Sequence, residues 1–185
     1  MAGKALDNQG ITRNNANNKT IYWSLLNYKG WKMYLAATDK GLCFVGSQNK
    51  PFDEVTNWAE KAFPGSAFEE NPGKLQPYAD QISEYLDGVR KSFSIPFDYN
   101  GTEFQQAVWR ALCEIPYGET KSYSDIAHHI QKPAAVRAVG AAIGKNPVLI
   151  TVPCHRVVGK DGSLTGFRGG LEMKKQLLIL EGNGQ

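Results

Sequence analysis

The 185-residue sequence is poor in metal-ligating and disulfide-forming residues, with three cysteines and three histidines. Cys43 is the only cysteine before residue 100 and His128 is the first histidine, so we expect no structural zinc site in the N-terminal half. We assign no metal and no cofactor to the chain. Three cysteines are also too few to indicate a disulfide framework, which favours a reducing compartment.

Long apolar runs are absent as well. No segment is long and apolar enough to span a bilayer, and the first residues lead into an asparagine-rich stretch, so we expect no secretory signal. With 42% hydrophobic and 21% charged residues, the composition is typical of a soluble globular protein. We therefore expect a cytoplasmic monomer, in a bacterial-type cytosol or nucleoid, with no membrane partner.

The net charge of +3 is unevenly distributed along the chain. Residues 1–99 contain eleven basic and eleven acidic side chains, whereas residues 100–185 contain ten basic and seven acidic ones. Residues 131–170 contain six basic side chains and a single acid, Asp161. Such a segment is often only a solvated surface. Here it surrounds a candidate reactive cysteine, which favours a polyanionic partner.

The N-terminal half has the pattern of a small domain of strands and helices. After a tail over residues 1–19 that we expect to be disordered, segments 20–27, 31–38 and 42–47 predict an antiparallel meander. Helices are predicted over residues 53–63 and 77–89, and the alternation over 93–97 predicts an extended segment. Pro96 and the turn formers that follow place a domain boundary after residue 98, giving domains 20–98 and 99–185. The apolar positions of the second helix are Tyr78, Ile82, Tyr85, Leu86 and Val89.

The domain over residues 99–185 is predicted to be mostly helical, so the fold class is α+β. Thr102 is the expected N-cap of a helix that ends near Ile115. Two short helices, 124–130 and 134–145, then form either a helix-turn-helix or an ordinary helical hairpin. DNA is favoured because the second of these helices is built mainly of small residues, among them Ala135, Ala138 and Gly140, with Arg137 as its one long interior side chain.

Cys154 is the candidate nucleophile. His155 and Arg156 follow it directly, and a thiol needs a neighbouring imidazole or positive charge to populate its thiolate. The apolar run 147–152 predicts a strand that Pro153 ends in a turn. Cys43 and Cys113 lie in apolar patterns, and we interpret both as small buried hydrophobes.

Four motifs in this region match one family in order and spacing. They are Asn146-Pro147, Pro153-Cys154-His155-Arg156-Val157-Val158, Gly166-Phe167-Arg168-Gly169-Gly170-Leu171 and the stretch 177–182. From about residue 101 to residue 182 the sequence resembles the methylated-DNA–protein-cysteine methyltransferases, or O6-alkylguanine-DNA alkyltransferases. The N-terminal half matches this family in general character only, where the resemblance implies a ribonuclease H-like domain.

The resemblance implies a DNA repair protein whose partner is double-stranded DNA containing O6-alkylguanine. The alkyl group of that base, and of O4-alkylthymine, would pass irreversibly to Cys154, once per molecule. The resemblance further implies a relay from Cys154 through a water and His155 to Glu181. Judged from sequence alone, Glu181 before Gly182 is an acidic residue at an exposed helix end.

The resemblance also implies how DNA is held. The target base must leave the duplex, and Arg137 would fill its place while the small-residue helix packs in the minor groove. Tyr123 would bond the flipped base and protonate the leaving purine, although a tyrosine in this position is also consistent with core packing.

Further residues are assigned to the base pocket by the same resemblance. Asn146 would brace the turns around Cys154. Phe167 would form an aromatic wall, and the carbonyls of Cys154 and Val157 would bind the exocyclic amine. Arg168 stands where some relatives have a small hydroxyl residue. Its backbone N–H would still contact the guanine O6, while the resemblance leaves the pocket width and the range of alkyl groups open.

Two other functions fit part of the pattern. A non-enzymatic DNA-binding regulator would use the helix-turn-helix but would not need the Pro-Cys-His-Arg-Val motif. A cysteine hydrolase would use Cys154, His155 and Glu181 as a triad, but direct Cys-His adjacency is unusual there and no oxyanion-hole sequence is evident. His128 and His129 are neighbours on one helix and so should point apart, as surface or DNA-backbone residues.

Overall fold

The computed structural model describes residues 19–183. The predicted tail therefore lies outside the described residues, except for Lys19. This residue is held in place, since its carbonyl accepts a hydrogen bond from the Ala67 N–H at 3.1 Å and its Nζ lies 3.1 Å from Asp98 Oδ2. The tail prediction is thus wrong for Lys19, because the first strand begins directly after it.

The N-terminal part is a four-stranded sheet with the order β3-β2-β1-β4. The predicted antiparallel meander is confirmed for its first three strands. A fourth strand was not predicted: it runs parallel to β1 at the sheet edge, so the sheet is mixed. All four residues of this strand are exposed, which leaves no apolar alternation in its sequence. The strands are β1 (Thr20–Tyr28), β2 (Trp31–Thr38), β3 (Gly41–Val45) and β4 (Ala67–Glu70).

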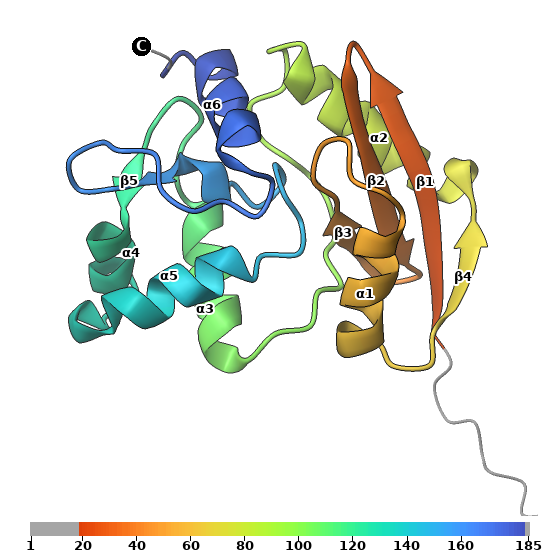
Figure 1. The fold of residues 1–185 in the computed structure, drawn as a ribbon, viewed down its shortest axis with the longest axis horizontal. Helices are drawn as coiled ribbons and strands as arrows, with labels where there is room; N and C mark the ends of the chain where they lie inside the picture. The colour runs from red at the N-terminus through yellow and green to blue at the C-terminus, as the bar shows by residue number, and fades with distance from the viewer. Residues whose placement is uncertain (1–18, 184–185) are drawn as a thin grey trace, which may run out of the picture.

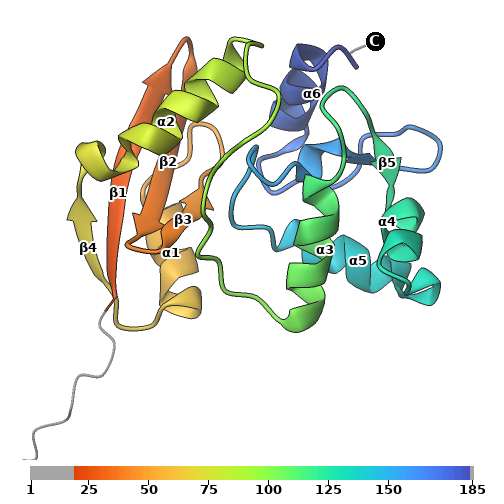
Figure 2. The same ribbon diagram turned by 180° about the vertical axis from the view of Figure 1, so that it is seen from behind.

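One helix covers each face of this sheet (Figures 1 and 2). On one face lies α1 (Asp53–Ala62), and on the other α2 (Pro72–Leu86). The second helix begins five residues earlier than predicted, because Asn71 caps it by accepting a hydrogen bond from the Lys74 N–H. It also ends earlier, so Val89 is 76% exposed instead of completing the apolar stripe.

The C-terminal part is mostly helical, as predicted. Thr102 caps α3 in a capping box with Gln105. The two short helices and their turn lie where the sequence places them, although the second begins as a 3₁₀ turn. The elements are α3 (Glu103–Cys113), β5 (Lys121–Ser122), α4 (Tyr123–His129), η1 (Pro133–Ala135), α5 (Val136–Gly144), η2 (Cys154–Arg156), β6 (Val157–Val158) and α6 (Leu171–Leu180).

The run 147–152 is a series of buried turns, so the predicted strand before Cys154 is wrong. Its pairing with the sheet is a single bridge between Val45 and Val148, and Ile150 adopts a positive φ of 68°. The run is apolar because it is buried, not because it is extended. The predicted extended segment 93–97 pairs with the sheet only at its end, where Phe97 bridges Leu42.

A continuous apolar core joins the two parts of the molecule. It includes Tyr85 and Leu86 of α2 together with Trp109 and Leu112 of α3. The Trp109 Nε1–H also donates to the Ala142 carbonyl of α5 at 2.9 Å, which fixes α5 on the helical part. Within residues 19–183, no helix is long and apolar enough to cross a membrane.

Candidate active site

Cys154 begins the short helix η2 and is 3% exposed. Its Sγ accepts a hydrogen bond from Asn146 Nδ2 at 3.1 Å. Burial raises the pKa of the Cys154 thiol above its ordinary value, and the Asn146 hydrogen bond offsets only part of this rise. The resting sulfur is therefore a protonated thiol, and a base must remove its proton before it can act as a nucleophile.

Asn146 is fully buried and organises the turns before Cys154. Its Nδ2 also donates to the Val152 carbonyl at 2.9 Å, and its Oδ1 accepts from the Val148 N–H at 3.0 Å. One side chain thus holds both the backbone run and the sulfur. The bracing role that the resemblance implies for Asn146 stays a prediction.

The two side chains that follow Cys154 in sequence, His155 and Arg156, both bond Glu181. His155 Nε2 lies 2.7 Å from Glu181 Oε1, and Arg156 Nε lies 2.9 Å from Oε2. Arg156 also donates from Nη1 to the Ile115 carbonyl at 2.6 Å. The expectation that Arg156 acts directly on the thiol is therefore wrong, because its guanidinium neutralises a buried carboxylate instead.

Glu181 is buried, with its side chain 0% exposed. The interpretation from sequence alone, an exposed acid at a helix end, is wrong because the Glu181 side chain turns inward to bond Tyr85, His155 and Arg156. Burial works to raise the pKa of this carboxyl, but hydrogen bonds from His155 and Arg156 outweigh it and hold the pKa at about 2. Glu181 is thus an anion shared by several donors.

His155 is a neutral base in this setting. Its burial lowers the pKa of the imidazole, and this outweighs the opposing effect of Glu181. Because Nε2 carries the hydrogen that faces Glu181, Nδ1 holds a lone pair, and among residues 19–183 this Nδ1 has no hydrogen-bond partner. Nδ1 is therefore available to accept a proton.

The depressed pKa of Glu181 predicts an acid-sensitive fold. Its ordinary pKa is 4.5 and its pKa in the fold is about 2, so its contribution is complete above pH about 4.5 and is lost as the pH falls through about 2. Glu181→Gln leaves Arg156 buried without a counterion, and we expect this to lower the free energy of unfolding by about 3–5 kcal/mol at pH 7. Urea unfolding at several pH values measures both effects, and an unchanged acid dependence in the variant would contradict the assignment.

Tyr123 and the loop 159–170 meet beside the site. Thr165 Oγ1 donates to Tyr123 Oη at 2.9 Å. Lys174 of α6 is fully buried, and its Nζ donates to the Thr165 carbonyl at 2.7 Å and to the Val157 carbonyl at 2.5 Å. Burial lowers the pKa of Lys174 to about 8. The sequence analysis did not identify Lys174 or Thr165 as site residues. The spacing could have indicated Lys174, because it precedes the apolar Leu177 by three residues and Leu178 by four, which places it on the same face of the helix.

The Arg168 side chain reaches the N-terminal part. Its Nη1 lies 2.8 Å from Glu54 Oε1, its Nη2 lies 2.6 Å from the Val45 carbonyl and its guanidinium stacks over Phe44. The guanidinium is thus held between the two parts of the molecule. Phe167, its neighbour, is half-buried against the core.

The helix-turn-helix presents a surface of small residues. Ala138 and Arg137 are exposed, and Ala135 and Gly140 are partly exposed. A Cβ added at Gly140 would lie 3.7 Å from the Tyr123 ring, so this glycine brings α5 close to the start of α4. Within the described residues Arg137 forms no ion pair, which leaves its guanidinium free for a partner.

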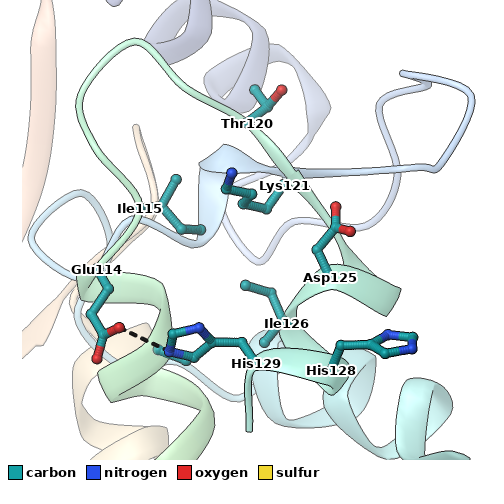
Figure 3. Close-up of a pocket in the computed structure, with 9 residues that line it drawn as sticks. Glu114, Ile115, Thr120, Lys121, Asp125, Ile126, His128 and His129 are labelled. Atoms are coloured by element: carbon teal, nitrogen blue, oxygen red, sulfur yellow. Dashed lines mark ion pairs between the residues drawn. The ribbon is translucent and has the colours of Figure 1, made fainter. Parts of the chain in front are cut away.

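His128 and His129 point in different directions, as predicted for neighbours on a helix (Figure 3). The Nε2 of His129 lies 2.8 Å from Glu114 Oε2, whereas His128 Nδ1 contacts the Ser124 carbonyl. Both line an open surface pocket of roughly 640 Å³ between α3 and α4. The residues lining this pocket do not include Asn146, Cys154, His155 or Glu181.

The other two cysteines differ from each other. Cys43 is buried, as expected, and burial raises its pKa far above the ordinary value. Cys113 is exposed, so the prediction of burial is wrong for it. Successive residues of an α-helix are rotated by about 100° about its axis, so Cys113 lies to one side of the buried stripe that contains Leu112. Desolvation by its neighbours still raises the pKa of Cys113 to about 11.

A helix-turn-helix beside a buried cysteine, with a neutral histidine backed by a buried carboxylate, defines a DNA-binding protein with a nucleophilic thiol. The chain matches the family model of the 6-O-methylguanine DNA methyltransferase DNA binding domain over residues 103–183, and that of the ribonuclease-like domain over residues 21–99. It belongs to the 6-O-methylguanine DNA methyltransferase family.

Named relatives and solved structures agree with this membership. The chain is 68% identical over 165 residues to the inducible methylated-DNA–protein-cysteine methyltransferase of Bacillus subtilis, covering 89% of this chain and 92% of that protein. It is 41% identical to the Methanosarcina barkeri methyltransferase, covering 88% and 98%. The crystal structure of Mycobacterium tuberculosis OGT in complex with DNA is similar at 36% identity and a TM-score of 0.75, covering 88% of this chain and 94% of that one.

Proposed function

We propose that this chain is a DNA repair protein that transfers the alkyl group of O6-alkylguanine to the sulfur of Cys154, once per molecule. The observation that carries the proposal is the buried cluster of Cys154, Asn146, His155 and Glu181, in which Nδ1 of a neutral histidine is free to accept a proton. Family membership supports the substrate and the direction of transfer. We place the reaction in the cytosol or nucleoid, acting as a monomer, with O4-alkylthymine as a second substrate.

The hydrogen bonds around His155 support a proton path. The Sγ–H proton of Cys154 passes through a water to His155 Nδ1, and Glu181 stabilises the imidazolium that forms. The thiolate then attacks the alkyl carbon, so a C–S bond forms while the C–O6 bond breaks. The electron pair of that bond leaves on guanine, which takes a proton from the Tyr123 hydroxyl. The product is a thioether, which has no good leaving group, so the protein is consumed.

Access to the base requires extrusion from the duplex. We propose that α5 lies in the minor groove, where Ala135, Ala138 and Gly140 permit close approach and Arg137 occupies the vacated place. Phe167, the backbone N–H of Arg168 and the carbonyls of Cys154 and Val157 would bind the flipped base. The second lone pair of the Val157 carbonyl remains for the exocyclic amine, since Lys174 uses the first.

We also propose the domain division made from the sequence, with 20–98 as the N-terminal domain and 99–185 as the DNA-binding and acceptor domain. The two family models match on either side of this boundary, at residues 21–99 and 103–183, which supports it. The shared core implies that the two domains are packed tightly against each other.

Intact mass spectrometry after incubation with duplex DNA containing O6-methylguanine tests the function. We expect a mass increase of one methyl group, mapped to Cys154 and stable to prolonged incubation. Absence of any adduct would indicate the DNA-binding regulator. A transient acyl adduct formed from an ester substrate would indicate the cysteine hydrolase. Removal of more than one methyl group per molecule would exclude single turnover.

Binding to DNA should weaken as salt is added. The excess of positive charge lies in residues 131–170, and each phosphate neutralised there contributes about −0.9 to the slope of log K against log salt. Lys132→Ala, in the turn between α4 and α5, should reduce this slope by about one. Lys50→Ala, an exposed lysine in the N-terminal part, is the matched control and should leave the slope unchanged. Fluorescence anisotropy on unrelated duplex sequences measures both, and a salt-insensitive preference for one sequence would contradict the proposal.

A further inference from the structure

Tyr85 brings a side chain of the N-terminal part into the Cys154 cluster. It lies on α2 and is fully buried. Its hydroxyl donates to Glu181 Oε1 at 2.5 Å and lies 3.2 Å from His155 Nε2. Its ring packs edge-on against Tyr117 and at 6.4 Å from the His155 ring. A phenol in the apolar stripe of α2 is thus joined by hydrogen bonds to an acid 96 residues further along the chain.

We infer that Tyr85 is a positioning residue for alkyl transfer, whose hydroxyl holds the Glu181 carboxylate and thereby keeps His155 a neutral base. The inference rests on the proposed function and assigns the N-terminal part a role in it. Tyr85 contacts neither the sulfur nor the base, so it acts only through Glu181 and His155.

The direction of its effect follows from the shared oxygen. Oε1 of Glu181 accepts from both Tyr85 Oη at 2.5 Å and His155 Nε2 at 2.7 Å. A hydroxyl that donates to this oxygen stabilises the carboxylate and weakens its pull on the imidazole proton. The 3.2 Å approach of the Tyr85 oxygen to Nε2 acts the other way, but it is longer, and the single Nε2 hydrogen is directed at Oε1. The net effect of the hydroxyl is to disfavour the imidazolium.

We expect the other groups around His155 to stay in place when this hydroxyl is removed, because the Phe ring keeps the shape of the Tyr85 ring. They come from η2, α6 and the segment after α3. Their electrostatic effect on the pKa of His155 is therefore the same in the variant and in the wild type. These groups are Cys154, Arg156, Lys174, Glu181 and Tyr117. A change in the titration of His155 in Tyr85→Phe is therefore due to the lost O–H.

The test is the pH dependence of the reaction with free O6-benzylguanine, which requires no DNA binding. The fall in rate at low pH, the acid limb of the pH–rate profile, reports protonation of His155, which removes the neutral base. In Tyr85→Phe we expect this limb to move to higher pH by about one unit, because a hydrogen bond to a charged group changes such an equilibrium by about tenfold. The rate on the alkaline plateau should stay within about threefold of wild type. Tyr78→Phe removes a phenol from the same helix outside the cluster, and its limb should not move.

A second measurement reads His155 directly. The chain has three histidines, and His128 and His129 are exposed, so the ¹⁵N signals of the buried His155 can be distinguished by their titration. We expect its pKa to rise in Tyr85→Phe and its Nδ1 to remain unprotonated at neutral pH. An unmoved or lowered pKa, or a rate reduced equally at every pH, overturns the inference. If the wild type takes up no alkyl group, the proposed function is wrong. The titration still decides whether the Tyr85 hydroxyl lowers the pKa of His155.

Discussion

Replacing Cys154 by alanine is expected to abolish alkyl transfer while leaving DNA binding nearly unchanged. In the proposed reaction the sulfur is the atom that forms the new bond, and no other described thiol is placed to replace it. Cys43 is buried in the N-terminal part, and Cys113 has a pKa of about 11, so at pH 7 only about one molecule in ten thousand carries a Cys113 thiolate. Intact mass and a binding isotherm on the same DNA measure the two properties.

Cys113→Ala is the matched control for this result. It removes the exposed thiol, and the variant should transfer one alkyl group per molecule at the wild-type rate. All three cysteines have pKa values raised by desolvation, so low pKa does not distinguish Cys154 at rest. Its partners do: Asn146 binds the sulfur, and His155 can accept a proton. An adduct on Cys43 or Cys113 in the wild type would contradict the assignment.

The elements that the sequence predicts well are those with strong periodicity or a local cap. Buried and more exposed residues alternate along part of the hairpin strand β1, and the capping box of Thr102 and Gln105 can be recognised from their spacing of three residues. Strand β4 carries no such signal, because all of its residues are exposed and its pairing partner lies far away in sequence. The run 147–152 was misassigned because burial alone makes a segment apolar whatever its backbone conformation.

The candidate site shows a similar limit. Adjacency in sequence identified Cys154 and His155, and the family spacing identified Glu181 and Asn146. Adjacency could not show that Arg156 would bond Glu181, or that Arg168 would bond Glu54 of the N-terminal part, because side-chain direction depends on the turns that η2 and the loop adopt. Tyr85 was recognised only as one apolar position of a helix, since periodicity reports that a residue is buried and not which polar group its hydroxyl meets.

Arg137→Ala is expected to slow repair of duplex DNA strongly while leaving the reaction with free O6-benzylguanine nearly unchanged. Arg137 is the long exposed side chain on a helix face of small residues, so it is the group there that can enter the base stack. Unstacking a base costs a few kcal/mol, and a side chain in the gap recovers part of this. If the recovered part is about 2 kcal/mol, the rate at saturating duplex falls about 30-fold. A free base needs no extrusion, so its reaction should be insensitive to the change.

The competing explanation is that Arg137 contacts only a phosphate. Its loss would then weaken binding and reduce the salt slope, and saturating DNA would restore the full rate. Lys132→Ala supplies the comparison, because Lys132 is an exposed cation in the turn before η1. We expect its loss to weaken binding while saturating DNA restores the full rate. Single-turnover rates at saturating duplex separate the two cases. A full recovery of Arg137→Ala, or an equal fall in its reaction with free base, would show that Arg137 does not stabilise the flipped state.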